Sequence, residues 1–153
     1  MTILLTNDDG YDADGICYLK SEIKKIEQTV TFAPRQNCSG YSAAISLGKD
    51  IEIEELNKDT FVISGTPADC SYFGLHGSKK FDFTQLVSGI NLGSNLGTDI
   101  FYSGTVGAAI AGLKLRYPPI AFSVASYQPK DLDFISKKCA EICLYVRNIN
   151  MSK

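Results

Sequence analysis

The sequence predicts an α/β protein with a Rossmann-like, three-layer fold, in which helices cover both faces of a mostly parallel sheet. Two observations predict this class. Short apolar runs that end in turn residues alternate along the chain with segments whose apolar residues recur at helical spacing. The chain has 153 residues, 44% hydrophobic and 21% charged, so it can bury a core of its own. We expect residues 1–153 to form a single domain.

The first expected unit is a strand, a helix and a second strand. The apolar run Ile3–Thr6 stops at the turn residues 7–10, which predicts a buried strand. A helix is expected next, because four apolar residues follow at helical spacing: Ile16, Leu19, Ile23 and Ile26. The second strand, Thr29–Ala33, ends at Pro34. Such a unit favours parallel strands joined by a right-handed crossover.

The middle of the chain predicts a long loop, a hairpin and a helix. Residues 35–47 are small and polar, which is typical of a loop. Two strand-like segments, 51–56 and 60–63, are separated by turn residues and predict the hairpin. The helix is expected at 66–75, because it begins with threonine and proline, which are preferred at the N-cap and at the first helical position.

The last part of the chain continues the alternation. A strand is expected at 83–88, a loop rich in glycine, serine and asparagine at 93–104, and a helix at 105–115. That helix is rich in alanine and glycine, so we expect another element to pack closely against it. A strand at 120–124 and a helix at 131–147 complete the expected elements.

Charge and cysteine content narrow the function classes. The net charge of −2 predicts no nucleic-acid-binding patch, so an anionic substrate must be held locally. The five cysteines form no CxxC pair, and the one histidine, His76, is expected at the surface. We expect structural thiols in a reducing cytosol and a cytoplasmic protein. No apolar run approaches the length of a membrane span, and the first residues lack the basic start of a signal peptide.

Polar side chains that suit a metal follow the ends of three predicted strands. Asp8 and Asp9 follow the first strand, Ser39 lies in the loop after the second, and Asn91 follows a later one. In open parallel sheets, ligands bind beyond the carboxyl ends of the strands. Adjacent carboxylates repel each other there, and a hard cation such as Mg²⁺ relieves the repulsion with oxygen ligands. The alternative is that Asp8 and Asp9 form an Asx turn or cap the helix.

A second candidate site is the glycine-rich segment before the helix at 105–115. Free backbone N–H groups at a helix start bind phosphate, and Ser103 and Thr105, on either side of Gly104, add hydroxyl groups. The alternative is a flexible loop with an ordinary N-cap. The segment is neither a Walker motif nor a Rossmann fingerprint.

Two further features of the sequence have structural as well as functional interpretations. Capping explains the segment 64–69, although substrate contact stays open for it. Three tyrosines, Tyr41, Tyr102 and Tyr127, could stack on a base or serve as ordinary packing residues.

Taken together, these blocks resemble the SurE family of survival-protein nucleotidases, in order and with similar spacing from residue 1 to about residue 126. The residues that carry the resemblance are Ile3–Gly10 with Gly15-Ile16, Ala33-Pro34 with Asn37–Gly40, Gly65–Cys70, Val87–Asn91, Asn95–Asp99 and Tyr102–Val106.

The resemblance implies a metal-dependent phosphatase that acts on nucleoside 5′- and 3′-monophosphates. It implies that Asp8, Asp9, Ser39 and Asn91 hold the metal, one Mg²⁺ or Mn²⁺ ion. It also implies that Asn95 and the turn Ser103-Gly104-Thr105 lie against the phosphate.

The sequence departs from the family pattern in two places. Ala111-Gly112 stands where the family usually has glutamate and glycine, which bears on helix packing rather than on catalysis. The chain stops at Lys153, whereas relatives continue with a β-hairpin and a tail that build a homodimer or tetramer and close over the active site. We therefore expect the C-terminal part of the family fold to be absent.

The expected reaction is metal-assisted hydrolysis, in which Asp8 or Asp9 orients or deprotonates the attacking water. Three alternatives stay open. Asp8 could instead be a covalent nucleophile, as in aspartyl-phosphate phosphatases. The chain could be a signalling receiver domain, although no strand at 51–64 ends in a suitable aspartate. It could also be a catalytically impaired fragment that binds only metal and nucleotide.

Overall fold

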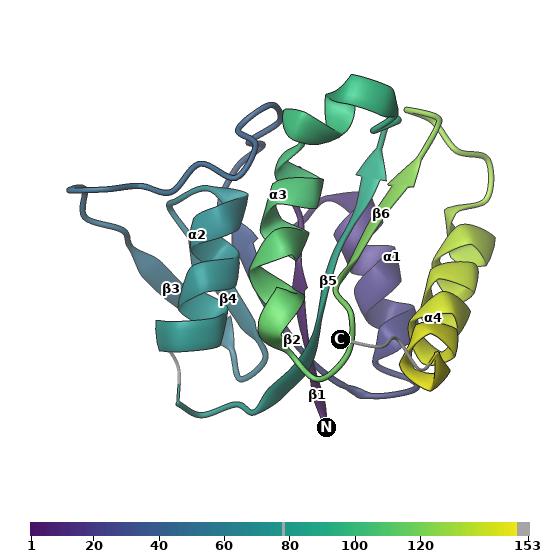
Figure 1. Ribbon diagram of the computed structural model, residues 1–153, viewed down its shortest axis with the longest axis horizontal. Coiled ribbons are helices and arrows are strands. Elements are labelled where there is room, and N and C mark those ends of the chain that lie inside the picture. The colour runs from purple at the N-terminus through teal and green to yellow at the C-terminus, as the bar shows by residue number, and fades with distance from the viewer. Residues whose placement is uncertain (78, 150–153) are drawn as a thin grey trace.

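The computed structural model describes residues 1–77 and 79–149, and its described part is built on one six-stranded sheet (Figure 1). The strands are β1 (Thr2–Thr6), β2 (Gln28–Pro34), β3 (Ile53–Asn57), β4 (Thr60–Ile63), β5 (Phe83–Leu92) and β6 (Ile120–Val124). Their order is β3-β4-β2-β1-β5-β6. Every neighbouring pair is parallel except β3 and β4. The predicted α/β class with a mostly parallel sheet is confirmed.

Helices cover both faces of this sheet, as Figure 1 shows. The longer elements are α1 (Asp14–Ile23), α2 (Pro67–Tyr72), α3 (Gly104–Ile110) and α4 (Leu132–Asn148). Shorter helical turns lie at η1 (Phe73–Gly77), η2 (Gly97–Phe101) and η3 (Ala111–Lys114). One apolar core joins the sheet to α1 and α4, and a second joins its other face to α2 and α3.

The central strand β1 shows why the sequence forms a sheet covered on both faces. Ile3 and Leu5 pack into the core beneath α1 and α4, whereas Leu4 packs into the core beneath α2 and α3. All three side chains are completely buried. A strand that is buried at every position has no solvent face, so it belongs in the middle of a parallel sheet.

The order of the strands creates a switch point beside β1. The chain runs outward from β1 to β2 and β4, and then returns to place β5 on the other side of β1. In such sheets the carboxyl ends of the two strands at the reversal leave a crevice between their loops. Asp8 and Asp9 directly follow β1, and Asn91 lies near the end of β5.

Several element boundaries differ from the predictions by a few residues, and two of these differences lie near the site. β5 continues through Leu92, so Asn91 lies within the strand. Asn91 pairs with Ser123 of β6, and this pairing extends the strand beyond Gly89. The helix expected at 105–115 begins at Gly104, and its last part is the tighter turn η3.

The expected close packing of the alanine- and glycine-rich helix is confirmed. A Cβ atom on Gly107 would lie 2.4 Å from the carbonyl oxygen of Ser42, and one on Gly112 would lie 2.6 Å from Cβ of Leu86. Both distances are far shorter than a carbon atom tolerates, so glycine permits the long loop and β5 to approach the helix. This packing fixes the loop at 35–47 against α3.

Further predictions concern the thiols and the membrane. The five cysteines all lie in the described part of the chain and form no disulfide; Cys17 is exposed and the other four are buried. Among residues 1–77 and 79–149, no helix has the length and apolar character needed to cross a bilayer.

Candidate metal and phosphate site

A cavity of about 430 Å³ opens where the carboxyl ends of β1 and β5 meet the loops after β2 and β5. The predicted site residues in its wall are Asp8, Asp9, Ser39, Asn91, Asn95 and Ser103. Residues from four separate stretches of the sequence therefore meet in one place. The predicted residues Gly104 and Thr105 do not line this cavity, but contact Asp8.

Asp8 forms the buried floor of the cavity, with only 3% of its surface exposed. The hydroxyl of Thr105 donates a hydrogen bond to Oδ1 of Asp8 at 2.5 Å. A Cβ atom on Gly104 would lie 2.9 Å from both Cβ and Oδ2 of Asp8, so only glycine allows the helix to approach the carboxylate so closely. Burial raises the pKa of Asp8, and the hydrogen bond from Thr105 and backbone groups of residues 104 and 105 offset part of that rise.

Asp9 is half-buried beside Asp8, and its pKa is raised to about 6. Burial is the largest cause, the negative charge of Asp8 is the next, and a backbone hydrogen bond from Leu92 works against both. Nδ2 of Asn37 donates a weak hydrogen bond to Oδ1 of Asp9 at 3.3 Å. The two carboxylates thus share a cavity in which their charges are opposed by dipoles alone.

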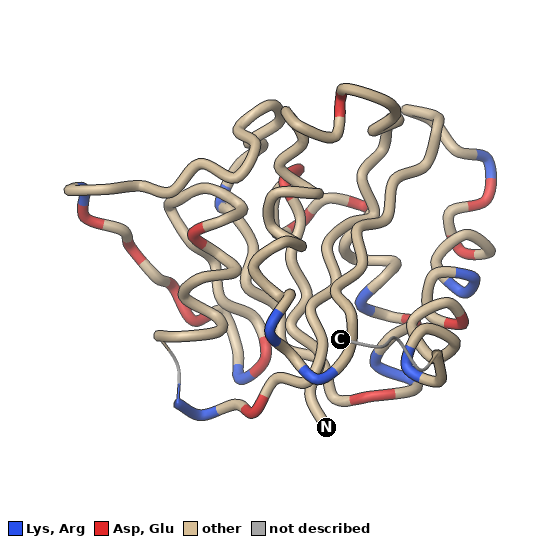
Figure 2. The backbone as a smooth tube through the Cα atoms, viewed as in Figure 1, with Lys and Arg blue, Asp and Glu red and all other residues tan. Residues whose placement is uncertain are grey.

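No basic side chain of the described residues lines this cavity. Figure 2 shows most of the Lys and Arg segments toward the lower end of the sheet and along α1 and α4, away from the carboxyl ends of β1 and β5. An anionic substrate that enters here would meet the carboxylates of Asp8, Asp9 and Asp99 and no cation of the described residues. The site therefore lacks the positive charge that binding a phosphate requires.

The neutral oxygen donors are held in place by short-range hydrogen bonds. Nδ2 of Asn91 donates to the carbonyl oxygen of Gly93 at 2.8 Å, which leaves the amide oxygen of Asn91 as its remaining acceptor. The backbone N–H of Ser39 donates to Oδ1 of Asn37 at 2.9 Å. The backbone N–H of Cys38 donates to the carbonyl oxygen of Asp8 at 2.7 Å, which ties this loop to the end of β1.

Asn37 is a positioning residue that the sequence reasoning missed. Its amide group binds Asp9 on one side and the backbone of Ser39 on the other, so it links two predicted metal ligands. An asparagine two residues before a serine in a polar loop is the signature of an Asx turn, and that signal could have found it. Asp99 also lies in the cavity wall and had no assigned role, and two of the three tyrosines considered for base stacking, Tyr102 and Tyr127, line the same cavity.

The donor set fits a hard divalent ion. Among residues 1–77 and 79–149, no three His, Cys, Asp or Glu side chains gather as a metal cluster, so a zinc site of that kind is not formed there. Two carboxylates with raised pKa values, a serine hydroxyl and an amide oxygen are oxygen ligands. Mg²⁺ and Mn²⁺ are commonly bound by one or two carboxylates together with neutral oxygens and water.

The predicted phosphate contacts divide into two groups. Ser103 and Asn95 line the cavity: Oγ of Ser103 accepts from the backbone N–H of Val106 at 3.2 Å, and Nδ2 of Asn95 donates to Oγ of Ser123 at 2.7 Å. Gly104 and Thr105 instead lie against the Asp8 carboxylate. Phosphate binding by Gly104 and Thr105 stays a prediction, and their observed contacts stabilise Asp8.

The structural interpretation of the segment 64–69 is confirmed. Thr66 and Asp69 form a reciprocal capping box at the start of α2, and Asp69 is almost fully buried. The carboxylate of Asp69 also accepts from the backbone N–H of Ser46 at 3.0 Å and from its hydroxyl at 2.7 Å. Asp69 therefore fastens the long loop that carries Ser39. His76 is exposed, as expected, on η1.

The family model of the survival protein SurE matches residues 3–152 of the chain. The 5′-nucleotidase SurE of Acinetobacter baylyi is 45% identical over 125 residues, which are 82% of this chain and 49% of the relative. The 5′-nucleotidase SurE of Pseudomonas syringae pv. syringae is 42% identical over 132 residues, 86% of this chain and 53% of the relative. The chain thus spans about half the length of these curated relatives.

The fold agrees with this match. The crystal structure of the SurE protein from Aquifex aeolicus superposes with a TM-score of 0.87 at 35% sequence identity, and the match covers 99% of this chain and 62% of that one. The order of the motifs, the switch-point cavity and the family model agree, and the chain belongs to the SurE family.

Proposed function

We propose that this chain hydrolyses nucleoside 5′- and 3′-monophosphates to nucleoside and phosphate, with the help of one divalent metal ion. The observation that carries the proposal is the pair of carboxylates, Asp8 and Asp9, at the switch point of the sheet, in a cavity that no basic side chain of residues 1–77 and 79–149 lines. Relatives named 5′-nucleotidase support the substrate class. Membership of the SurE family displaces the receiver-domain alternative.

The residues that would hold the metal are Asp8, Asp9, Ser39 and Asn91, because they offer oxygen atoms to the same cavity. When Mg²⁺ or Mn²⁺ is bound, it supplies Lewis-acid polarisation of the phosphoryl group and a lowered pKa of water.

The chain's own residues bind and orient the reacting groups. Thr105 and the start of α3 hold the Asp8 carboxylate in one orientation and favour its ionised form. Asp9 is half-buried and lines the cavity, whereas Asp8 is almost fully buried and bonded to Thr105, so Asp9 is the better placed of the two to orient or deprotonate the attacking water. Ser103 and Asn95 supply polar groups for the phosphoryl oxygens.

The proposal is tested by measuring phosphate release from 5′-AMP, 3′-AMP and p-nitrophenyl phosphate with Mg²⁺, Mn²⁺ or EDTA. We expect turnover that requires the ion and disappears in EDTA. We also expect Asp8→Ala and Asn91→Ala to abolish it while the circular dichroism spectrum stays unchanged. Full turnover in EDTA, or in either folded variant, would contradict the proposal.

The same samples separate the remaining alternatives. A phosphoenzyme sensitive to hydroxylamine would indicate the covalent route through Asp8. Binding of Mn²⁺ without turnover of any ester would identify the chain as a metal- and nucleotide-binding fragment. The five free thiols support the cytoplasm as the compartment, and a homodimer or tetramer stays a prediction.

A further inference from the structure

Tyr127 is an exposed aromatic side chain at the mouth of the polar cavity. It lines the cavity although 83% of its surface is exposed, whereas Asp8 on the floor is 3% exposed. Its ring lies directly against Gly93, where a Cβ atom would be 2.9 Å from Cε1 and 3.4 Å from Cζ of the tyrosine. Any larger residue at position 93 would displace the ring. The ring is therefore held against the backbone on one side and open on the other.

Gly93 connects this ring to the metal-binding side of the cavity. Its carbonyl oxygen accepts the hydrogen bond from Nδ2 of Asn91, and its backbone N–H donates to the carbonyl oxygen of Val124 at 2.9 Å. One glycine thus supports both the orientation of a proposed metal ligand and the position of Tyr127. A single backbone segment therefore contacts both the proposed metal ligand and the aromatic ring.

We propose that Tyr127 is the platform on which the nucleobase of the substrate stacks, so that this residue determines the preference for nucleotides over other phosphate monoesters. The proposal rests on the proposed function and names the part of the same cavity that recognises the base. An aromatic ring binds any base by its face, which suits an enzyme that acts on several nucleotides. Because no described basic residue lines the cavity, the base must be recognised by stacking and hydrogen bonds rather than by a fixed positive charge.

The other two tyrosines singled out in the sequence are less suited to this role. Tyr41 lines a different cavity, on the far side of the loop that carries Ser39. Tyr102 lines the same cavity as Tyr127, but its carbonyl oxygen accepts from the backbone N–H of Ser42, and it directly precedes the helix cap Ser103. Its substitution would disturb the phosphate side as well as the mouth.

The first test compares two substrates with the same ester, 5′-AMP and ribose 5-phosphate, of which only the first carries a base. In Tyr127→Ala with Mn²⁺, the ratio of their kcat/KM values should fall by about tenfold, the effect of losing one stacking contact. Tyr127→Phe should keep the ratio, because the ring remains. Tyr145→Ala is the matched control, since Tyr145 is also highly exposed but lies on α4. A ratio that changes less than about twofold in Tyr127→Ala overturns the proposal.

The second test does not depend on turnover. The chain contains no tryptophan, so Tyr127→Trp introduces a single tryptophan at the mouth of the cavity, and its emission can be excited separately from that of the tyrosines. With Mg²⁺, 5′-AMP should quench its fluorescence and ribose 5-phosphate should not, and Tyr145→Trp should respond to neither. If the wild-type chain releases no phosphate from any ester, the proposed function fails. The fluorescence titration still shows whether the nucleobase stacks on the side chain at position 127. Absence of quenching in Tyr127→Trp overturns the proposal that residue 127 is the stacking platform.

Discussion

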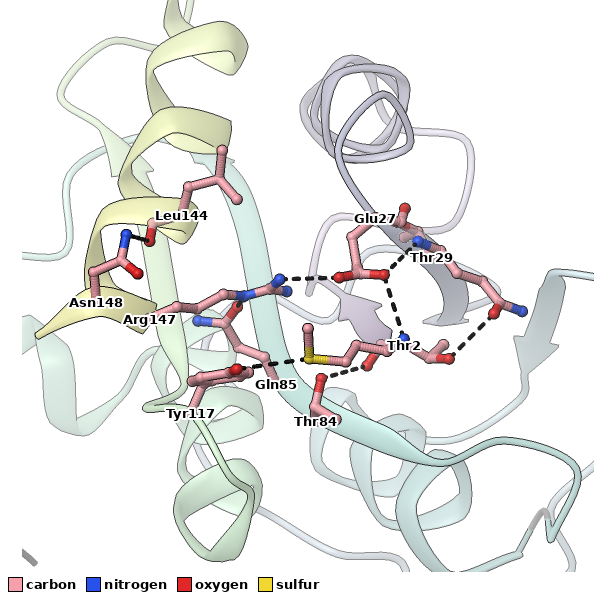
Figure 3. A network of polar contacts seen from close by, with 11 residues as sticks. Thr2, Glu27, Thr29, Thr84, Gln85, Tyr117, Leu144, Arg147 and Asn148 are labelled. Carbon is pink, nitrogen blue, oxygen red and sulfur yellow. Dashed lines mark hydrogen bonds and ion pairs between the residues drawn. The ribbon is translucent and has the colours of Figure 1, made fainter. Parts of the chain in front are cut away.

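The pKa values of acidic side chains are shifted in opposite directions at the two ends of the sheet. At the amino ends of β1 and β2, Glu27 accepts a hydrogen bond from Nη1 of Arg147 at 3.1 Å and lies 3.5 Å from the ammonium group of Met1 (Figure 3). Burial alone would raise the pKa of Glu27, but the bond from Arg147 and the neighbouring positive charges lower it overall. At this end the chain supplies its own cations.

Arg147 extends this pairing into a network that fastens α4 to the sheet. Its Nε donates to Oε1 of Gln85 at 2.9 Å, and its guanidinium lies 5.1 Å from the ring centroid of Tyr117. Asp59, in the turn before β4, is paired in the same way with Lys20 and Lys24. Burial would raise the pKa of Asp59, but the two lysines lower it to about 2.

At the carboxyl ends of β1 and β5, the pKa values of Asp8 and Asp9 are raised instead. At the amino ends of the strands, the acidic side chains are paired with cations of the chain itself. At the carboxyl ends, no basic side chain of the described residues lines the cavity of Asp8 and Asp9. Unopposed buried carboxylates destabilise a fold, and proteins retain such groups chiefly at functional sites. The Arg147 network, at the opposite end, joins α4 to Gln85 of β5 and to Glu27, which directly precedes β2.

The largest effect is expected on turnover when the unpaired end is altered. Asp8→Asn keeps the shape of the side chain but removes its charge, so metal-dependent phosphate release should fall by about a thousandfold or more, a loss of about 4 kcal/mol of transition-state stabilisation. Asp59→Asn is the matched change at the paired end and should leave kcat near its wild-type value. Comparable losses in both variants would show that the two ends do not differ in function.

The next largest effect is expected on stability when the paired end is broken. Arg147→Ala leaves Glu27 and Gln85 without their guanidinium partner in a largely buried position. Removing one member of a buried pair costs about 3 kcal/mol or more, and urea denaturation should show that decrease in the free energy of unfolding. Turnover per folded molecule should be unchanged. A decrease below about 1 kcal/mol would mean that the network resembles an ordinary surface pair.

Much of the fold follows from the sequence because its signals are local. The apolar run of β1, the cap at Thr66 and the small residues of α3 each predict their own element. The proposed ligands Asp8, Ser39 and Asn91 could also be placed together, since the carboxyl ends of parallel strands meet at one edge.

The remaining features depend on contacts between distant parts of the chain. Thr105 and Asp8 are 97 residues apart, and Arg147 and Glu27 are 120 residues apart, so no local pattern reveals either bond. The length of β5 was missed because its last residues are ordered by pairing with β6.

A further prediction concerns the pH dependence of metal binding. Asp9 has a pKa of about 6, so it takes up a proton when the pH falls below that value. A carboxyl group must lose its proton before it can bind a metal. The affinity for Mn²⁺ should therefore rise by about fivefold between pH 5 and pH 6 and by about tenfold between pH 5 and pH 7, and level off above that. Electron paramagnetic resonance of free Mn²⁺ measures this directly. Asp9→Asn should bind more weakly with a flatter profile, and a flat wild-type profile would exclude Asp9 as a ligand.

The smallest effect is expected from the turn before β4, where Lys20 and Lys24 hold Asp59 at 3.2 Å and 2.8 Å. Asp59→Asn should lower the free energy of unfolding at pH 7 by about 1 kcal/mol, less than the pKa shift alone implies, because solvent screens a partly exposed pair. The folded-state pKa of about 2 lies below the ordinary value of 3.8, so this contribution is present above about pH 4 and is lost as the pH falls toward 2. Urea denaturation at pH 7 and at pH 2.5 should show the two proteins converging at the lower pH, whereas the exposed Asp82→Asn should match the wild type at both. A difference as large at pH 2.5 as at pH 7 would show that Asp59 acts through its hydrogen bonds to the turn rather than through its charge.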